Sequence, residues 1–112
     1  MNFGGAAAAI LAAQGEAVVL RRGGAETPLR AVVTDHGLCP PPPGWPGPVF
    51  SHVAEHAEFR FDASQVDPAR GDLILWSGRE YGVRQVLPEP RSLPSAPLWR
   101  VCRAAAQQRG KY

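Results

Sequence analysis

The stretch that decides the fold is Val66–Val86, VDPARGDLILWSGREYGVRQV. It contains two short, mainly apolar runs, Asp72–Trp76 and Glu80–Leu87, and the turn dipeptide Ser77-Gly78 lies between them. Short runs of aliphatic, β-branched and aromatic residues on either side of a glycine-containing dipeptide predict an antiparallel β-hairpin. In this hairpin we expect the following side chains to point into the core: Leu73, Leu75, Tyr81, Val83 and Val86.

An Arg-Gly-Asp triplet, Arg70-Gly71-Asp72, stands at the start of the hairpin and has the form of an adhesion signal. That function requires a secreted protein that carries the triplet at an exposed loop tip, and no export signal is evident. The residues instead have the chemistry of a turn. Pro68 fixes a backbone angle, Gly71 can adopt a positive φ, and Asp72 can accept hydrogen bonds from backbone amides. We therefore predict a structural corner that leads into the strand.

Extended segments continue on both sides of this hairpin. In the segment His56–Asp62, apolar and polar residues alternate, which places Phe59 and Phe61 on one face of a strand and Arg60 on the other. Short strands separated by turn residues are typical of an all-β protein, and we predict a small antiparallel β-sandwich or barrel of about six or seven strands. The further strands are expected at Glu16–Arg22, Pro28–Asp35, His56–Asp62 and Leu98–Arg103.

Length and hydropathy allow one small domain. A chain of 112 residues buries roughly 60–70% of the surface that its unfolded form exposes. We expect the β domain over residues 16–103, an arm or short helix over 1–15, and a tail over 104–112 that frays at the surface. No apolar run approaches the ~20 residues of a membrane span, so we expect no contact with a membrane.

One long proline-rich loop is predicted over residues 36–54. Its first part, His36–Pro48, contains six prolines and three glycines, a composition that can hold neither a helix nor a strand ladder. We expect a rigid, partly polyproline II segment. Its apolar side chains have no local core to enter, and exposed aromatic residues in such loops mark contacts with another chain. The candidate contacts to neighbouring subunits are Leu38, Pro42, Trp45, Val49 and Phe50.

The N-terminal segment is rich in alanine and has a good composition for a helix. A helix of this length is marginal in water by itself, so we expect a short helix or an arm that becomes ordered against a partner, and Gly15 is its natural end. The side chains that would make those contacts are Phe3, Ile10 and Leu11.

The charged and cysteine residues exclude some function classes. The net charge is only +2, so the charge of the protein as a whole does not indicate nucleic-acid binding. Eleven of the twelve basic residues are arginine, which suits pairing with carboxylates or phosphates. Cys39 and Cys102 are far apart in the chain, and we expect two free thiols. Arginines that could pair across subunits or line a DNA channel are Arg60, Arg79, Arg84 and Arg100.

The sequence HVAEH, His52–His56, fits the H-x-x-E-H pattern of one class of zinc peptidases. That chemistry requires His52 and His56 on one face of a helix, with Glu55 as the general base. The segment instead leads into a predicted strand, so we expect two ordinary surface or loop histidines, no metal and no cofactor. A nucleophile elbow and a phosphate-binding loop are also missing, and we expect no enzyme. A zinc-dependent hydrolase and a monomeric β-barrel adaptor for peptide or nucleic acid remain as alternatives.

A composite motif runs through the hairpin: R-G-D-L at Arg70–Leu73, then a turn, then Y-x-V-x-x-V-x-P. This motif resembles the head–tail joining proteins of long-tailed phages, which are also called head-completion, stopper or tail-attachment proteins. The segment LRAVVTD is also similar to the strand that precedes the long loop in that family, and PLWRV is similar to its closing strand. The residues that carry the resemblance are Arg70, Gly71, Asp72, Leu73, Gly78, Tyr81, Val83, Val86 and Pro88.

The resemblance implies a β-sandwich or barrel subunit without catalytic residues that assembles into a homo-oligomeric ring of about six or twelve copies. Its implied partners are portal and adaptor proteins on one side and the tail terminator or tail tube on the other, with transient, non-specific contact to passing double-stranded DNA. The implied location is the neck of a virion that is assembled in the host cytoplasm. Residues 36–54 and 1–14 would become ordered in the ring. A tail-completion ring protein is the closest alternative.

Overall fold

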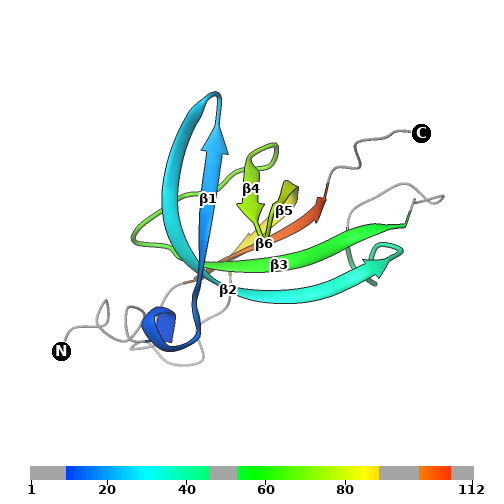
Figure 1. The fold of residues 1–112 in the computed structure, drawn as a ribbon. Helices are drawn as coiled ribbons and strands as arrows, with labels where there is room; N and C mark the ends of the chain where they lie inside the picture. Colours follow the sequence, from blue (N-terminus) through cyan, green and yellow to red (C-terminus); the bar gives the residue numbers. More distant parts are fainter. Residues whose placement is uncertain (1–9, 46–52, 89–98, 107–112) are drawn as a thin grey trace.

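The computed structural model describes residues 10–45, 53–88 and 99–106, and in these residues the chain forms a closed antiparallel β-barrel with one short helix over residues 10–14 (Figure 1). The order of neighbouring strands is β1-β2-β3-β6-β5-β4, and β4 pairs back to β1. The predicted all-β class is therefore confirmed, in its barrel form. The strands are β1 (Glu16–Arg22), β2 (Ala25–Cys39), β3 (Ala54–Asp62), β4 (Leu73–Trp76), β5 (Arg79–Pro88) and β6 (Trp99–Ala106).

The core lies inside the barrel and is built from alternate residues of the strands. Phe59 and Phe61 are fully buried and Arg60 is exposed, as the alternation of β3 predicts. Tyr81 is also fully buried, and its ring packs at 5.4 Å, centroid to centroid, from Phe59. Edge-to-face pairs of this kind add to the burial of aromatic area. Val83 is buried, and the half-buried Val86 packs against the same cluster.

The predicted phase of β4 is wrong. Ile74 is fully buried, whereas Leu73 and Leu75 are only partly buried and lie on the outer face. The reason is the register, because Ile74 lies opposite Tyr81 and so shares the inner face with it. In a run of four consecutive apolar residues, the pattern alone does not show which pair faces the core.

β2 is longer than predicted and extends into the segment that was expected to be a loop. It runs from Ala25 to Cys39, with a β-bulge between Asp35 and Gly37. Gly37 has a φ of 71°, and its amide donates to the Asp35 carboxylate over 2.8 Å. The bulge accommodates the extra residue, so the ladder with β3 continues to the pair Cys39 and Ala54. Figure 1 shows that β2 first follows β1 and then bends to run beside β3.

β6 also runs further than predicted, as far as Ala106. The expected frayed tail is therefore wrong for its first residues, since Ala104 is fully buried and Ala105 is 3% exposed. Ala104 lies opposite both Ala57 of β3 and Val83 of β5, where a small side chain lets the neighbouring strands pack closely. Residues 107–112 lie outside the described residues.

The short helix packs on the outside of the chain's own barrel. Leu11 and Trp99 form a second small core with Ile10 and Val32 beside them. The amide of Gly15 donates to the Leu11 carbonyl over 2.8 Å and ends the helix where the sequence predicts. Of the two predicted forms of this segment, the short helix is therefore the one observed for residues 10–14, and the barrel itself covers Leu11. Among the described residues, no helix is long and apolar enough to cross a membrane.

Candidate interaction surface

The Arg-Gly-Asp triplet forms the predicted corner. Gly71 has a φ of 97°, and the Asp72 carboxylate accepts a hydrogen bond from the Ala69 amide over 2.9 Å. The main partner of Asp72 is Arg22, which no local sequence pattern indicates and whose guanidinium donates to both Asp72 oxygens over 2.9 and 2.7 Å. The bidentate bond to Arg22 and the Ala69 amide hold the pKa of the Asp72 carboxyl below its ordinary value, although burial opposes this shift. Asp72 is thus engaged in the scaffold, not offered to a ligand.

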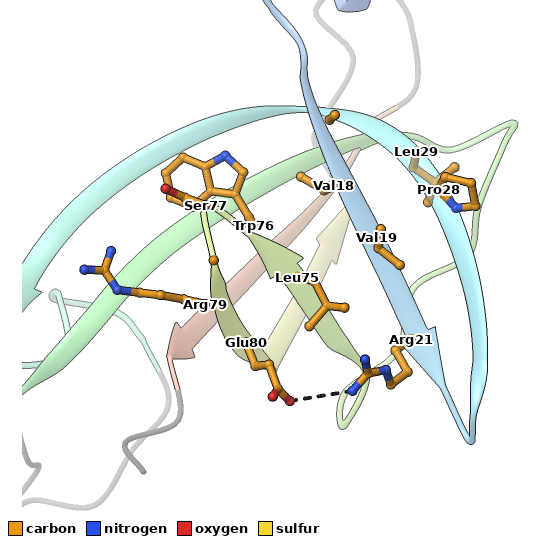
Figure 2. A pocket seen from close by; sticks show the side chains of 12 residues that line it. Val18, Val19, Arg21, Pro28, Leu29, Leu75, Trp76, Ser77, Arg79 and Glu80 are labelled. Carbon is orange, nitrogen blue, oxygen red and sulfur yellow. Dashed lines mark ion pairs between the residues drawn. The ribbon is translucent and has the colours of Figure 1, made fainter. Parts of the chain in front are cut away.

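A groove opens on the outside of the barrel where β1 meets β4 and the β4–β5 turn (Figure 2). Its volume is about 510 Å³. Val19 of β1 and Leu75 of β4 are register partners, and both point away from the barrel core. The lining residues come from β1, β2, β4, β5 and the β4–β5 turn: Ala17, Val18, Val19, Arg21, Pro28, Leu29, Leu75, Trp76, Ser77, Gly78, Arg79 and Glu80.

Charged and polar contacts frame this groove and hold its walls. Arg21 lies 2.8 Å from Glu26 on the same hairpin and 3.7 Å from Glu80 of β5, an ion pair drawn in Figure 2. The indole Nε1 of Trp76 donates to the Glu16 carboxylate over 3.0 Å. The groove therefore has an apolar floor, and Arg21, Glu80 and the exposed Arg79 lie at its rim. The groove could not be predicted from the sequence, because the β1–β4 pairing joins distant segments and because Leu75 was expected in the core.

A second hollow adjoins the groove and shares Pro28 and Leu29 with it. It has a volume of about 460 Å³ and reaches the short helix at Leu11 and Ala12. The outer surface around the β1–β2 hairpin is therefore indented on both sides of Pro28 and Leu29.

Trp45 is packed against the chain itself, which corrects the prediction of an exposed contact residue. Its ring centroid lies 5.6 Å from that of His36 and 5.3 Å from that of His56, with the rings nearly perpendicular in both pairs. The guanidinium carbon of Arg103 lies 5.8 Å from the ring centroid, within cation–π range. The Trp45 amide donates to the Pro42 carbonyl over 3.1 Å, closing a tight turn.

The H-x-x-E-H segment does not have the arrangement that a zinc peptidase needs. Glu55 and His56 are consecutive residues of strand β3 and so point to opposite faces, whereas the peptidase motif requires a helix. His56 is 3% exposed, which corrects the expectation of a surface or loop histidine, and its Nδ1 lies 2.9 Å from the Ala54 carbonyl. His52 lies outside the described residues. Within residues 10–45, 53–88 and 99–106, no three His, Cys, Asp or Glu side chains are grouped to hold a metal ion.

Both cysteines are free thiols. Cys102 is fully buried in the barrel, and this burial raises the pKa of its thiol to about 12. Cys39 is half-buried, and its Sγ lies 3.6 Å from Nδ1 of His56. The two thiols therefore occupy different environments, one in the core and one beside the Trp45 turn.

The end of the β2–β3 hairpin carries exposed apolar side chains. Leu38 is 65% exposed and Val53 is 46% exposed, and these are the large exposed hydrophobic residues in the described part of the chain. Leu38 lies opposite Glu55 in the register. Pro42 is half-buried, and Phe3, Val49 and Phe50 lie outside the described residues. Of the predicted contact residues that the structure describes, Leu38 is thus the most exposed one.

The four arginines predicted to face a channel or a neighbouring subunit are not brought together. Arg79 lies at the start of β5, and Arg100 pairs in register with Pro88 at its other end. Arg79 also lies 3.9 Å from Glu55 within the same chain. Arg60 and Arg84 are exposed on β3 and β5. The described residues therefore show no continuous basic stripe.

No protein-family model matches this chain, and no curated protein matches it. What the chain does is therefore inferred from its residues and their geometry.

Proposed function

We propose that this protein is a structural subunit of the head–tail connector ring in the neck of a tailed phage or a phage-like particle. It would join the portal and adaptor proteins to the tail and help to close or line the DNA channel. The observation that carries the proposal is a small barrel that leaves apolar side chains open to solvent, in the groove of Figure 2 and at the exposed Leu38 and Val53.

Open apolar surfaces of this kind support an assembly role. A contiguous apolar patch on the surface of a soluble protein marks a site of contact with another molecule, and burying that patch in the contact gains free energy. A subunit of an obligate assembly recovers that free energy by burying these surfaces against its neighbours. The hairpin motif that resembles the phage joining proteins is consistent with this role, since Tyr81 and Val83 build the barrel core.

The distribution of charge also suits a channel through which DNA passes. The affinity of a protein for DNA rises with each lysine or arginine that neutralises a phosphate. A channel that must release DNA therefore needs few basic side chains along its wall. The net charge of +2 and the separated positions of Arg79 and Arg100 meet this requirement.

The test is to measure the mass of the purified full-length chain with and without a purified portal–adaptor complex, followed by imaging of the product. We expect a ring at the tail-facing end of the adaptor. Assembly with a tail tube but not with the portal complex would instead support a tail-completion ring. A chain that stays monomeric and joins neither complex would contradict the proposal and support the monomeric adaptor.

A further inference from the structure

We propose that residues 1–9 of this chain fold back onto their own barrel, with Phe3 seated in the hollow beside the short helix. The inference goes beyond the proposed function, because it concerns one chain by itself and holds whether or not copies form a ring. The hollow is lined by Leu11, Ala12, Pro28, Leu29, Arg30 and Gln65.

The place where residues 1–9 join the described chain selects them as the occupant of this hollow. They enter the helix at Ile10, directly before Leu11 and Ala12, and these two residues line the hollow. No lining residue adjoins another segment outside the described residues, since those segments join the chain at Trp45, Val53, Pro88, Trp99 and Ala106. Residues 1–9 are therefore the segment whose point of attachment lies at the hollow itself.

Covalent attachment favours this occupant over a free molecule. A group that is joined to its site by a short segment has an effective concentration on the order of millimolar, which a free competitor would have to match. The backbone from Phe3 to Ile10 spans at most about 25 Å when it is fully extended. Gly4 and Gly5 can adopt the backbone angles that reverse its direction. Phe3 is therefore within reach of a hollow that begins at Leu11.

The chemistry of residues 1–9 matches that of the hollow. Their sequence, MNFGGAAAA, contains no charged side chain, and Phe3 is its one aromatic residue. Most of the lining side chains are apolar, and none is acidic. The one charged lining residue, Arg30, already donates to the carbonyls of Leu11 and Gly15 and so holds the helix against β2. An uncharged, apolar occupant is therefore favoured over a charged one.

Burial of the aromatic ring is the gain that holds the segment in place. The hollow has a volume of about 460 Å³, which has room for one phenyl ring. Its walls include the exposed Ala12 and Pro28 and the half-buried Leu29. Seating Phe3 there removes apolar surface from water on both sides of the contact. A helix of five residues has little stability of its own, so this contact also stabilises the helix over residues 10–14.

The first test is a crosslink within the full-length chain at low protein concentration. In a Cys39→Ser background, Phe3→Cys is combined with Gln65→Cys, at an exposed residue of the hollow. We expect an intramolecular disulfide on mild oxidation, detected by mass spectrometry, while the buried Cys102 stays reduced. The control combines Phe3→Cys with Arg84→Cys, at an exposed position that does not line the hollow. The first pair should react roughly tenfold faster than the control pair.

The second test is a double-mutant cycle that is measured by thermal unfolding. Phe3→Ala should lower the unfolding temperature by a few degrees, and Asn2→Ala, in the same segment, is the matched control that should not. Ala12→Glu places a charge in the hollow at an exposed position and keeps a residue that favours a helix. In the Ala12→Glu background, Phe3→Ala should produce little further change, because the contact is already lost.

Three results would overturn the inference. The first is a Phe3 and Gln65 cysteine pair that reacts no faster than the control pair. The second is a Phe3→Ala effect that is absent, or that persists in full in the Ala12→Glu background. The third is a mixture of Phe3→Cys and Gln65→Cys chains that forms a disulfide between two chains as readily as the doubly substituted chain forms one within itself. That result would assign the hollow to the segment of another copy.

Discussion

At the scale of single residues, the chain places its polar groups where they hold the barrel together. Asp72 is 5% exposed and bonds to Arg22, which lies 50 positions earlier in the chain. The same carboxylate accepts the Ala69 amide, so one side chain joins the β1 end to the corner before β4. A buried carboxylate is tolerated only when its oxygens are paired in this way.

Replacing Asp72 by asparagine should therefore destabilise the fold in a pH-dependent manner. We expect a loss of about 1–3 kcal/mol at neutral pH, because one charge-assisted bidentate contact is weakened. Arg22 keeps the folded pKa of Asp72 below its ordinary value of 3.8, so the stabilisation is fully present above that pH and is lost as the pH falls through the folded pKa. Urea unfolding from pH 7 to pH 2 should show the difference between wild type and D72N shrinking in acid. A difference that is constant across this range would contradict the assignment, and Arg70→Ala is the exposed control.

Tyr81 is a residue at which the fold tolerates an unpaired polar group. Its side chain is fully buried, and its hydroxyl has no hydrogen-bond partner among residues 10–45, 53–88 and 99–106. Burial raises the pKa of the Tyr81 hydroxyl, and the nearby Arg79 only partly offsets this effect. Tyr81→Phe keeps the ring that packs on Phe59 and removes the unpaired group, so we expect equal or higher stability, by up to about 1 kcal/mol. Thermal unfolding measures this, and a clear loss of stability would show that the hydroxyl is bonded in solution.

At the scale of elements, the tight turns decide the register of the barrel. Ser77 and Gly78 have φ values of 53° and 75°, the left-handed pair that matches the twist of a two-residue hairpin. This turn sets Ile74 opposite Tyr81 and so determines which face of β4 enters the core. The hairpin between β1 and β2 uses Gly23 and Gly24 in the same way.

Substitutions in the β4–β5 turn should have opposite signs at its two positions. Gly78→Ala adds a side chain at a positive φ and should cost about 1 kcal/mol. Ser77→Asn puts a residue that tolerates the left-handed region at the other position and should gain up to about 0.5 kcal/mol. Chemical denaturation of the two variants measures both values. Equal effects at the two positions would contradict the turn geometry.

The Trp45 turn is the element that links the proline-rich segment to the barrel. Trp45 packs between His36 of β2 and His56 of β3, and Arg103 of β6 donates to the Gly44 carbonyl over 3.1 Å. Three strands therefore hold one short turn. The same turn covers His56, which would otherwise be exposed on the outer face of the sheet.

Trp45→Ala should remove this cover without dissolving the barrel. We expect a destabilisation of about 1–3 kcal/mol, since a half-buried aromatic side chain is lost. Urea unfolding measures the loss, and near-ultraviolet circular dichroism should show that Trp76 and Trp99 keep their environments. Pro43→Ala, at an exposed position of the same turn, is the matched control. A Trp45→Ala variant as stable as wild type would show that the turn is not held through this ring.

At the scale of the whole molecule, the dominant feature is the separation of charge between the β2–β3 hairpin and the rest of the barrel. The segment 32–58 carries −3 in a chain of net charge +2. Such an asymmetry produces a field that can orient an approaching charged molecule.

Self-association should therefore weaken as salt is added. Surface charges are screened over about 10 Å at 0.1 M ionic strength, so the electrostatic part of the attraction falls while the apolar part remains. Sedimentation velocity over a salt series measures this. Association that strengthens steadily with salt would show that apolar burial alone drives the contact.

The local sequence pattern was sufficient to predict the positions of most of the strands and the corner at Gly71 and Asp72. Alternation, turn dipeptides and glycines at positive φ act over a few residues, so they can be recognised in the chain itself. They located β1, β3 and β5 to within a few residues and identified Phe59, Phe61 and Tyr81 as core. The Arg22 partner of Asp72 could not be found in this way, because nothing local relates residues 50 positions apart.

The amino-acid sequence by itself determined an all-β domain, the position of its central hairpin and the charge asymmetry between its parts. Only the tertiary structure decided that the sheet closes, since the pairing of Val19 with Leu75 joins segments that are distant in the chain. Closure also decided the inner face of β4, the bulge that extends β2, the packing of Trp45 and the existence of the groove. Each of these depends on which strand lies beside which, and strand pairing is settled by the burial of the whole core and not by local preference.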